Sequence, residues 1–236
     1  METDSNGNTV TINSITPKGQ GYFLQKIYDK IKPEKSLEVG FAFGISTLFI
    51  LEKCLEHKRE NGCHIVIEPF DWGNAAIYNI QKAGLEKYID IRKELSDRVL
   101  PAMYLRNERI QFAYVDTTKV FDIVLQDFYF IDKILDIGGV VIFDDATTQG
   151  INLVMRFIKS LPHYEVFDKY EKLEVSKKYL IGERIFEKLI EAVPFKKRFM
   201  SNLSLKTSRE LALNYRCIAF KKIDIDKRNW DWQAPL

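Results

Sequence analysis

The chain has 236 residues, of which 46% are hydrophobic and 29% charged, and its 35 basic and 33 acidic residues leave a formal net charge of +2. This composition is that of a folded protein with one core, and it excludes a disordered chain. The near balance of charge gives no reason to expect a nucleic-acid partner, and no apolar run approaches the roughly 20 residues that cross a bilayer. We therefore expect a small-molecule ligand and no nucleic-acid or membrane partner.

The cysteines and the first residues bear on the compartment. Cys54, Cys63 and Cys217 are the only three cysteines, and none forms a CxxC pair. An odd, small number without that spacing predicts neither a disulfide framework nor a zinc cluster. The polar opening 1–8 lacks the basic and apolar regions of a signal peptide. The sequence thus favours a cytoplasmic protein and leaves its oligomeric state open.

Strand and helix patterns alternate along most of the chain, after a polar stretch, 1–15, that is expected to be a flexible N-terminus. The predicted helices lie at 16–31, 47–59, 73–83, 96–103, 120–135 and 148–161, and the predicted strands at 37–39, 63–68, 88–91, 110–115 and 140–143. Such alternation implies right-handed crossovers and a parallel sheet with helices on both faces.

The pattern changes after the last of these helices. Two further strands, 163–167 and 215–220, predict a closing antiparallel pair. The connection between them, about 170–213, is rich in lysine and aromatic residues and long enough to be an inserted helical or lid region. The predicted fold is therefore α/β, Rossmann-like and doubly wound, with a mostly parallel seven-stranded sheet in a single domain over 16–236. The tail 228–236 could dock on this domain.

Polar residues and glycines follow the predicted strands, where open parallel sheets bind their ligands. The turn between the first strand and its helix contains Gly40 and Gly44. Such a turn lets the backbone approach a ligand, and the helix start offers unpaired N–H groups to a polar or anionic partner. Glu68 and Asp116 follow the second and fourth strands. The pattern predicts a site for a nucleotide-type cofactor.

Four segments together resemble the class I S-adenosylmethionine (SAM)-dependent methyltransferases, in particular the bacterial O-methyltransferase-like group. Residues 38–46, Glu-Val-Gly-Phe-Ala-Phe-Gly-Ile-Ser, are similar to the first motif of that family, and 67–69, Ile-Glu-Pro, to the acidic end of its second strand. Residues 95–101 resemble the segment beside the adenine, and 135–145 the Leu-x-x-Gly-Gly-Val-Val-x-x-Asp-Asp ending. The resemblance spans 17–145.

This resemblance implies SAM as the cofactor and methyl transfer to an oxygen of a small-molecule acceptor. Gly40 and Gly44 would lie against the amino-acid portion of SAM and Glu38 near its ammonium group. Glu68 would accept the ribose hydroxyls, and Ser46 would cap the following helix or touch the cofactor. The implied cofactor-binding residues are Glu38, Gly40, Gly44, Ser46, Glu68, Ser96 and Asp116.

The resemblance also implies a possible divalent metal, because related enzymes hold an ion between carboxylates at the ends of the fourth and fifth strands. The residues at those positions are Asp116, Asp144 and Asp145, whose oxygens suit Mg²⁺, and Asp116 and Asp144 are the candidate catalytic residues. In an alternative interpretation, Asp144 and Asp145 cap the next helix. The sequence departs from the family at Lys119, where a histidine is common, at Asp145, where an amide is common, and at Ala42, which replaces a glycine.

Two other functions remain open. An NAD-dependent oxidoreductase uses the same strand, turn and helix, although the spacing of Gly40 and Gly44 lacks a full Gly-x-Gly-x-x-Gly. A non-catalytic binding protein with a methyltransferase fold would account for the missing histidine and for Asp145, since a fold does not fix a function.

Overall fold

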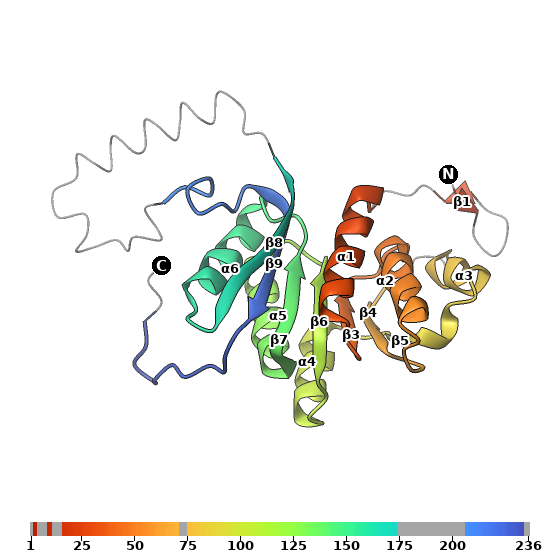
Figure 1. Ribbon diagram of the computed structural model, residues 1–236, viewed down its shortest axis with the longest axis horizontal. Helices are drawn as coiled ribbons and strands as arrows, with labels where there is room; N and C mark the ends of the chain where they lie inside the picture. The colour runs from red at the N-terminus through yellow and green to blue at the C-terminus, as the bar shows by residue number, and fades with distance from the viewer. Residues whose placement is uncertain (1, 4–8, 11–15, 71–74, 174–205, 234–236) are drawn as a thin grey trace.

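A computed structural model describes residues 2–3, 9–10, 16–70, 75–173 and 206–233 of the chain. Most of the predicted flexible N-terminus, 1–15, and most of the predicted insertion, about 170–213, lie outside these ranges. Figure 1 shows a central sheet with helices on both sides. A separate two-residue ladder pairs β1 (Glu2–Thr3) with β2 (Thr9–Val10).

The helices and strands of the main body follow the predicted order. The helices are α1 (Lys18–Ile31), α2 (Ile45–Glu56), α3 (Ala75–Lys82), the 3₁₀ helix η1 (Glu86–Tyr88), α4 (Ser96–Leu105), α5 (Phe121–Ile134) and α6 (Gln149–Ser160). The strands are β3 (Ser36–Val39), β4 (His64–Ile67), β5 (Ile89–Arg92), β6 (Ile110–Val115), β7 (Leu135–Phe143), β8 (Tyr164–Lys172) and β9 (Tyr215–Lys222).

The seven long strands form one sheet in the order β5-β4-β3-β6-β7-β9-β8. Strands β3 to β7 pair in parallel, whereas β9 runs antiparallel to both of its neighbours, β7 and β8. The predicted fold, a mostly parallel seven-stranded sheet closed by an antiparallel pair, is confirmed. The order reverses next to β3, so the first two crossovers run toward one edge of the sheet and the later ones toward the other.

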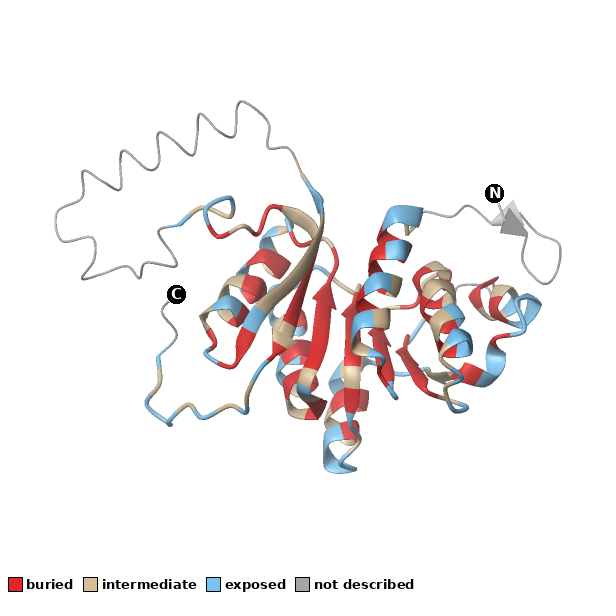
Figure 2. Ribbon diagram, in the orientation of Figure 1, coloured by how far each residue is buried: buried red, intermediate tan, exposed pale blue. Residues whose placement is uncertain are grey.

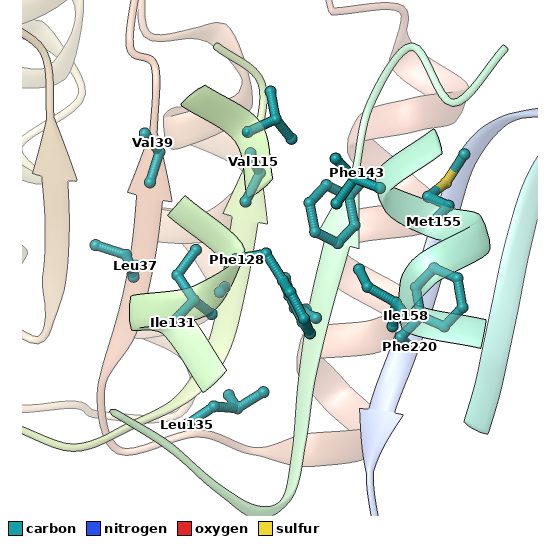
Figure 3. Close-up of a cluster of buried hydrophobic side chains, with 14 of the residues drawn as sticks. Leu37, Val39, Val115, Phe128, Ile131, Leu135, Phe143, Met155, Ile158 and Phe220 are labelled. Atoms are coloured by element: carbon teal, nitrogen blue, oxygen red, sulfur yellow. The ribbon is translucent and has the colours of Figure 1, made fainter. Parts of the chain in front are cut away.

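Two hydrophobic cores cover the two faces of the sheet. Phe112 and Tyr114 of β6 face α1, α2 and α3, whereas Ala113 and Val115 face α4, α5 and α6. Successive residues of a strand point to opposite faces, so a strand buried on both sides is apolar throughout. Figure 2 shows this continuous burial along the central strands, and Figure 3 shows Phe128 of α5 packed among the side chains of the second core.

The largest difference from the predicted elements is in β7. The strand was expected at 140–143 after a glycine turn, but it begins at Leu135, directly after α5. Gly138 (φ +88°) and Gly139 lie inside the strand, where the pairing with β6 shifts its register. A β-carbon at Gly139 would lie 2.9 Å from the carbonyl oxygen of Asp136 and 3.0 Å from that of Gln111, so Gly139 allows the close approach of β6.

The described end of the chain packs on the second core, as the docking prediction for 228–236 requires of its first part. Trp232 lies against this core, and the guanidinium of Arg228 lies 4.7 Å from its ring centroid and 5.8 Å from that of Phe157. None of the helices in the described ranges is long and apolar enough to cross a membrane.

Candidate cofactor and acceptor site

A cleft of about 570 Å³ opens at the carboxyl ends of β3, β4 and β6, beside the first turns of α2 and α4. Five predicted cofactor residues line it: Gly40, Ser46, Glu68, Ser96 and Asp116. The other lining residues are Thr16, Val39, Phe41, Ala42, Phe43, Ile45, Ile67, Pro69, Phe70, Leu95, Thr117, Thr118, Lys119 and Ile123. The predicted residues Glu38, Gly44, Asp144 and Asp145 are not among those that line it.

The two glycines of the turn are required by contacts within the protein. Gly40 has φ +95°, and a β-carbon there would lie 2.0 Å from the carbonyl oxygen of Asp116. Gly44 has φ +71°, and its β-carbon would lie 3.0 Å from Ala76 and from the ring of Phe41. Both conformations are ones that other residues rarely adopt. The turn is therefore shaped by the packing of β6 and α3 around it.

Glu68 holds the glycine turn in place through backbone hydrogen bonds. Its Oε2 accepts the amides of Phe41 (3.0 Å) and Ala42 (3.2 Å), and its Oε1 accepts the amide of Phe70 (3.0 Å). A carboxylate has about four acceptor positions, so one position on Oε1 is left by these three donors for a ligand hydroxyl. Glu68 thus both orders the turn and faces the cleft.

Glu38 is fully buried under the first turn of α2, and its link to the cleft runs through Ser46. Its carboxylate accepts the hydroxyls of Ser46 and Thr47 (2.6 Å to the latter) and lies 3.1 Å from Nε2 of His64. Nδ1 of His64 is 2.9 Å from the hydroxyl of Ser36. Thr47 and His64 were not expected here. The signal for His64 was a single polar residue inside an otherwise apolar strand.

Ser46 caps no helix, although capping was one of its two expected roles. The residue at the N-cap of α2 is Gly44, and no side chain caps that helix. Ser96 is the first residue of α4, after Leu95 at the N-cap. The hydroxyl groups of both serines form hydrogen bonds with buried carboxylates instead, that of Ser46 with Glu38 and that of Ser96 with Asp127.

Asp127 of α5 is a third residue that the sequence interpretation missed. It is 1% exposed, and its pKa is raised to about 6 by burial, with the hydrogen bond from Ser96 opposing the shift. Its Oδ2 has no partner among the described residues. An acidic residue on the apolar face of α5, between Val124 and Phe128, was the available signal. Asp127 is the group that orients Ser96 at the cleft.

The structure brings together the three carboxylates at the ends of β6 and β7. One oxygen each of Asp116, Asp144 and Asp145 lie within 4.8 Å of one another. The pKa of Asp116 is raised to about 6 by burial and then by Asp144, while Lys119 opposes the shift. Nζ of Lys119 lies 3.1 Å from Oδ1 of Asp116 and 2.8 Å from Oδ2 of Asp145. An ammonium group therefore bridges two of the three acids.

Asp144 is 4% exposed and is surrounded by donors from the protein itself. Its Oδ2 accepts Nε2 of Gln20 (2.7 Å) and the hydroxyl of Tyr114 (3.2 Å). Its Oδ1 accepts the amide of Asp145 (2.7 Å) and the thiol of Cys217 (3.2 Å). Four donors fill the acceptor positions of this carboxylate. Asp144 thus joins α1, β6, β7 and β9.

The interpretation of Asp144 and Asp145 as caps of α6 is wrong, because Thr148 is the N-cap and no side chain caps this helix. The arrangement also does not fit Mg²⁺. That ion needs carboxylate oxygens with open lone pairs, but the oxygens of Asp144 are occupied and Lys119 already bridges Asp116 and Asp145. The proximity of the three acids, considered without these contacts, would have suggested a metal site.

The fold is that of an α/β protein, with a cleft beyond the carboxyl ends of its parallel strands. Comparison with protein families is more specific: residues 37–146 match a family described as a methyltransferase domain. This range contains the glycine turn, Glu68, Ser96 and all three clustered acids. A search of curated proteins finds no significant match.

Known structures have the same fold at low sequence identity. The O-methyltransferase from Bacillus cereus, in complex with SAH, is 22% identical with a TM-score of 0.56, covering 66% of this chain and 76% of its own. TomG from Streptomyces achromogenes, an O-methyltransferase in complex with SAM, is 13% identical with a TM-score of 0.60, covering 89% and 81%. The SAH-bound methyltransferase PaMTH1 from Podospora anserina is 16% identical with a TM-score of 0.56, covering 65% and 74%.

Residues 37–146 of this chain thus match a methyltransferase domain, and its fold is that of solved O-methyltransferases that bind SAM or SAH. The resemblance found in its four sequence segments is thereby confirmed.

Proposed function

We propose that this protein transfers the methyl group of SAM to an oxygen of a small-molecule acceptor. The observation that carries the proposal is the glycine turn held by Glu68 at the mouth of a cleft, within a methyltransferase domain. SAH and SAM are bound by proteins of this fold from Bacillus cereus and Streptomyces achromogenes. The domain match does not favour an NAD-dependent oxidoreductase, which had shared the same strand, turn and helix.

The residues of the cleft fit such a cofactor. Its volume of about 570 Å³ is within the range of small-molecule sites, and its walls combine carboxylates and hydroxyls with apolar side chains. The open acceptor position of Glu68 suits a ribose hydroxyl. At the start of α4, Leu95 offers an apolar contact and Ser96 a polar contact to an adenine. The acidic groups suit a ligand with positive charge.

When bound, SAM supplies a methyl group on a positively charged sulfur, which keeps the bonding electron pair when the acceptor oxygen takes the carbon. Asp116 receives the proton that the acceptor hydroxyl loses, because it is the carboxylate that both lines the cleft and has a pKa raised to about 6, near the working range of a general base. Asp144, the other candidate catalytic residue, is enclosed by protein donors and positions its neighbours. The cleft walls orient the reactants, which can supply much of the acceleration.

Titration calorimetry with SAM and SAH tests the cofactor. The wild-type protein should bind SAH at sub-millimolar concentration, and Glu68→Ala should weaken binding by about tenfold or more, because removal of the carboxylate releases three backbone amides of the turn. Glu86→Ala, on the exposed helix η1, is the matched control and should bind like the wild type. If neither compound binds, or if Glu68→Ala changes nothing, the proposed function is abandoned.

A methyl-labelled SAM assay over a panel of phenols, carboxylic acids and alcohols then separates an enzyme from a binding protein. Label transferred to an acceptor supports the proposal. A protein that binds SAH but transfers label to no member of the panel supports the non-catalytic alternative. The three cysteines are free and buried, as expected for the cytoplasmic setting that forms part of this proposal.

A further inference from the structure

We propose that Lys119 is the built-in cation of the acceptor site and takes the place of a divalent metal between Asp116 and Asp145. Its remaining N–H donates to the acceptor oxygen, so methyl transfer proceeds without an added metal ion. This inference rests on the proposed function and names the group that would meet the acceptor in the same cleft.

The hydrogen-bonding capacity of Lys119 is the first support. An ammonium group has three donors and no acceptor. Two of them are directed at Asp116 (3.1 Å) and Asp145 (2.8 Å), and no third acceptor for Nζ is found among the described residues. The side chain is 39% exposed and lines the cleft. The third N–H is thus available to a ligand in the cleft.

The charge of Lys119 is held by its two partners. Lysine carries its positive charge at neutral pH. Nζ of Lys119 is paired with a carboxylate on each side, at 3.1 Å and 2.8 Å. A cation held between two carboxylates at a ligand site has the electrostatic role that a divalent ion plays elsewhere, which is to stabilise negative charge on a reacting oxygen.

The third carboxylate explains why a metal ion would not displace the lysine. An ion needs several oxygen ligands with open lone pairs. Asp144 has both oxygens occupied by Gln20, Tyr114, Cys217 and the amide of Asp145. Binding an ion would cost these buried hydrogen bonds as well as the two ion pairs of Lys119. If Asp144 kept its hydrogen bonds, the ion would have only Asp116 and Asp145 as ligands and would have to displace Lys119 from both.

The backbone of Lys119 is fixed by close packing against α6. A β-carbon at Gly150, in the first turn of that helix, would lie 2.2 Å from the carbonyl oxygen of Lys119 and 3.2 Å from the amide of Phe121. The turn after β6 therefore rests directly on the helix backbone. This contact presents the lysine to the cleft from a defined position, as a preorganised donor requires.

The acceptor class follows from this donor. A cation that donates to the reacting oxygen stabilises an oxygen that carries negative charge at the moment of transfer. Phenolic and carboxylic oxygens lose their proton far more readily than aliphatic alcohols. We therefore expect acidic oxygens as acceptors, with Lys119 bound to the oxygen and Asp116 receiving its proton where one remains.

Manganese binding tests the assignment without any need for turnover. Mn²⁺ alone is titrated into the wild-type protein, Lys119→Ala and Lys119→Arg, with binding followed by electron paramagnetic resonance. The wild type and Lys119→Arg should show no site for one ion per chain, whereas Lys119→Ala should gain a site for one Mn²⁺ per chain, since two carboxylates lose their cation. Asp116→Asn in the Lys119→Ala background should abolish this site.

The controls keep the outcomes distinct. Lys82→Ala, an exposed lysine of α3, should behave as the wild type does. Circular dichroism shows whether Lys119→Ala is folded, and if it is not, Lys119→Met, which keeps the apolar length of the side chain, replaces it. A wild-type site for Mn²⁺ that Asp116→Asn removes, or a folded Lys119→Ala that binds no ion, overturns the proposal.

Activity gives a second readout. Methyl transfer by the wild type should persist in excess EDTA, and loss of turnover that Mg²⁺ restores would overturn the inference. Failure of SAH to bind in calorimetry would remove the proposed function and leave the Mn²⁺ result to decide the role of the lysine.

Discussion

Two clusters of acidic residues, each with one lysine, lie at opposite ends of β7. The cleft cluster consists of Asp116, Lys119, Asp144 and Asp145, next to the last residue of the strand. The basal cluster consists of Asp132, His163, Lys222 and Asp226, next to its first residue. In composition the two are alike, and both would attract attention as metal sites.

The two lysines differ in the number of hydrogen-bond donors that remain free for a ligand. Lys222 is 8% exposed, and its three donors meet the carbonyl oxygens of Asp132 (2.5 Å) and Leu135 (3.2 Å) and Oδ1 of Asp132 (3.2 Å). Lys119 is 39% exposed and meets two acceptors among the described residues. A lysine whose three donors are all used within the protein, as those of Lys222 are, fastens α5 to β7 and β9. A lysine with a donor facing a cleft is able to bind a ligand.

Replacing the proposed base of the cleft cluster should have the largest effect. Asp116→Asn should lower kcat/KM by about 10²- to 10⁴-fold, because the acceptor loses its proton acceptor, while SAH affinity changes little. The pKa of Asp116 is raised to about 6, so wild-type kcat/KM should increase with pH up to about 6 and then level off. A rate profile measured from pH 5 to 8 checks this. A profile of the same shape in Asp116→Asn would contradict the assignment.

Breaking the basal cluster should affect stability and leave the cofactor site intact. Lys222→Met removes the buried ammonium group that pairs with Asp132 and releases two backbone carbonyls, so the free energy of unfolding should fall by about 3–5 kcal/mol. Urea denaturation measures the change, and calorimetry with SAH should give wild-type affinity for the folded variant. Lys227→Met, on the exposed tail, is the control. Equal stability of the two variants would remove the distinction between the clusters.

Asp127, a buried carboxylate outside both clusters, sharpens the comparison because no basic side chain in the described part of the chain pairs with it. Burial raises the pKa of Asp127 to about 6, above its ordinary value of 3.8. Its contribution to stability is therefore full below pH 3.8 and lost as the pH rises through about 6. Asp127→Asn removes this loss, so its stability relative to the wild type should increase by about 2 kcal/mol between pH 4 and pH 8.

Urea denaturation of both proteins at the two pH values provides the measurement, and Asp122→Asn, an exposed residue of the same helix, should show no such trend. A constant difference between Asp127→Asn and the wild type would show that Asp127 does not titrate in this range.

The sheet and the proximity of the acidic residues could be predicted because both follow from the order of the strands and helices, which the pattern of apolar residues indicates. Ile110–Val115 is apolar at every position except Gln111, as is typical of a strand buried on both faces, and its predicted bounds are those of β6. Parallel strands end at one edge, so Asp116 and Asp144, which follow β6 and β7, had to come close. These conclusions need the backbone alone.

What the sequence could not supply is the direction of individual side chains. Glu38 was expected near the cofactor, but it turns under α2 toward Thr47 and His64, since an acidic residue in a buried strand needs donors within the core. Lys119 was noted as a departure from the family, but its contact with both Asp116 and Asp145 depends on a turn pressed against Gly150. Such contacts join residues that are far apart in the sequence, and no regular sequence pattern indicates them.

The close approach of Gly40 to Asp116 has a consequence for the accuracy of the reaction. The turn proposed to hold the methyl donor and the carboxylate proposed to take the proton belong to two different crossovers, yet their backbones are in direct contact at this glycine. In an in-line transfer, a displacement of about 1 Å between the reactants can cost a hundredfold in rate. The absence of a side chain at Gly40 therefore limits how far the methyl donor and the acceptor can be displaced from each other. They are aligned by one backbone contact, and any larger residue at position 40 would disturb the alignment of both.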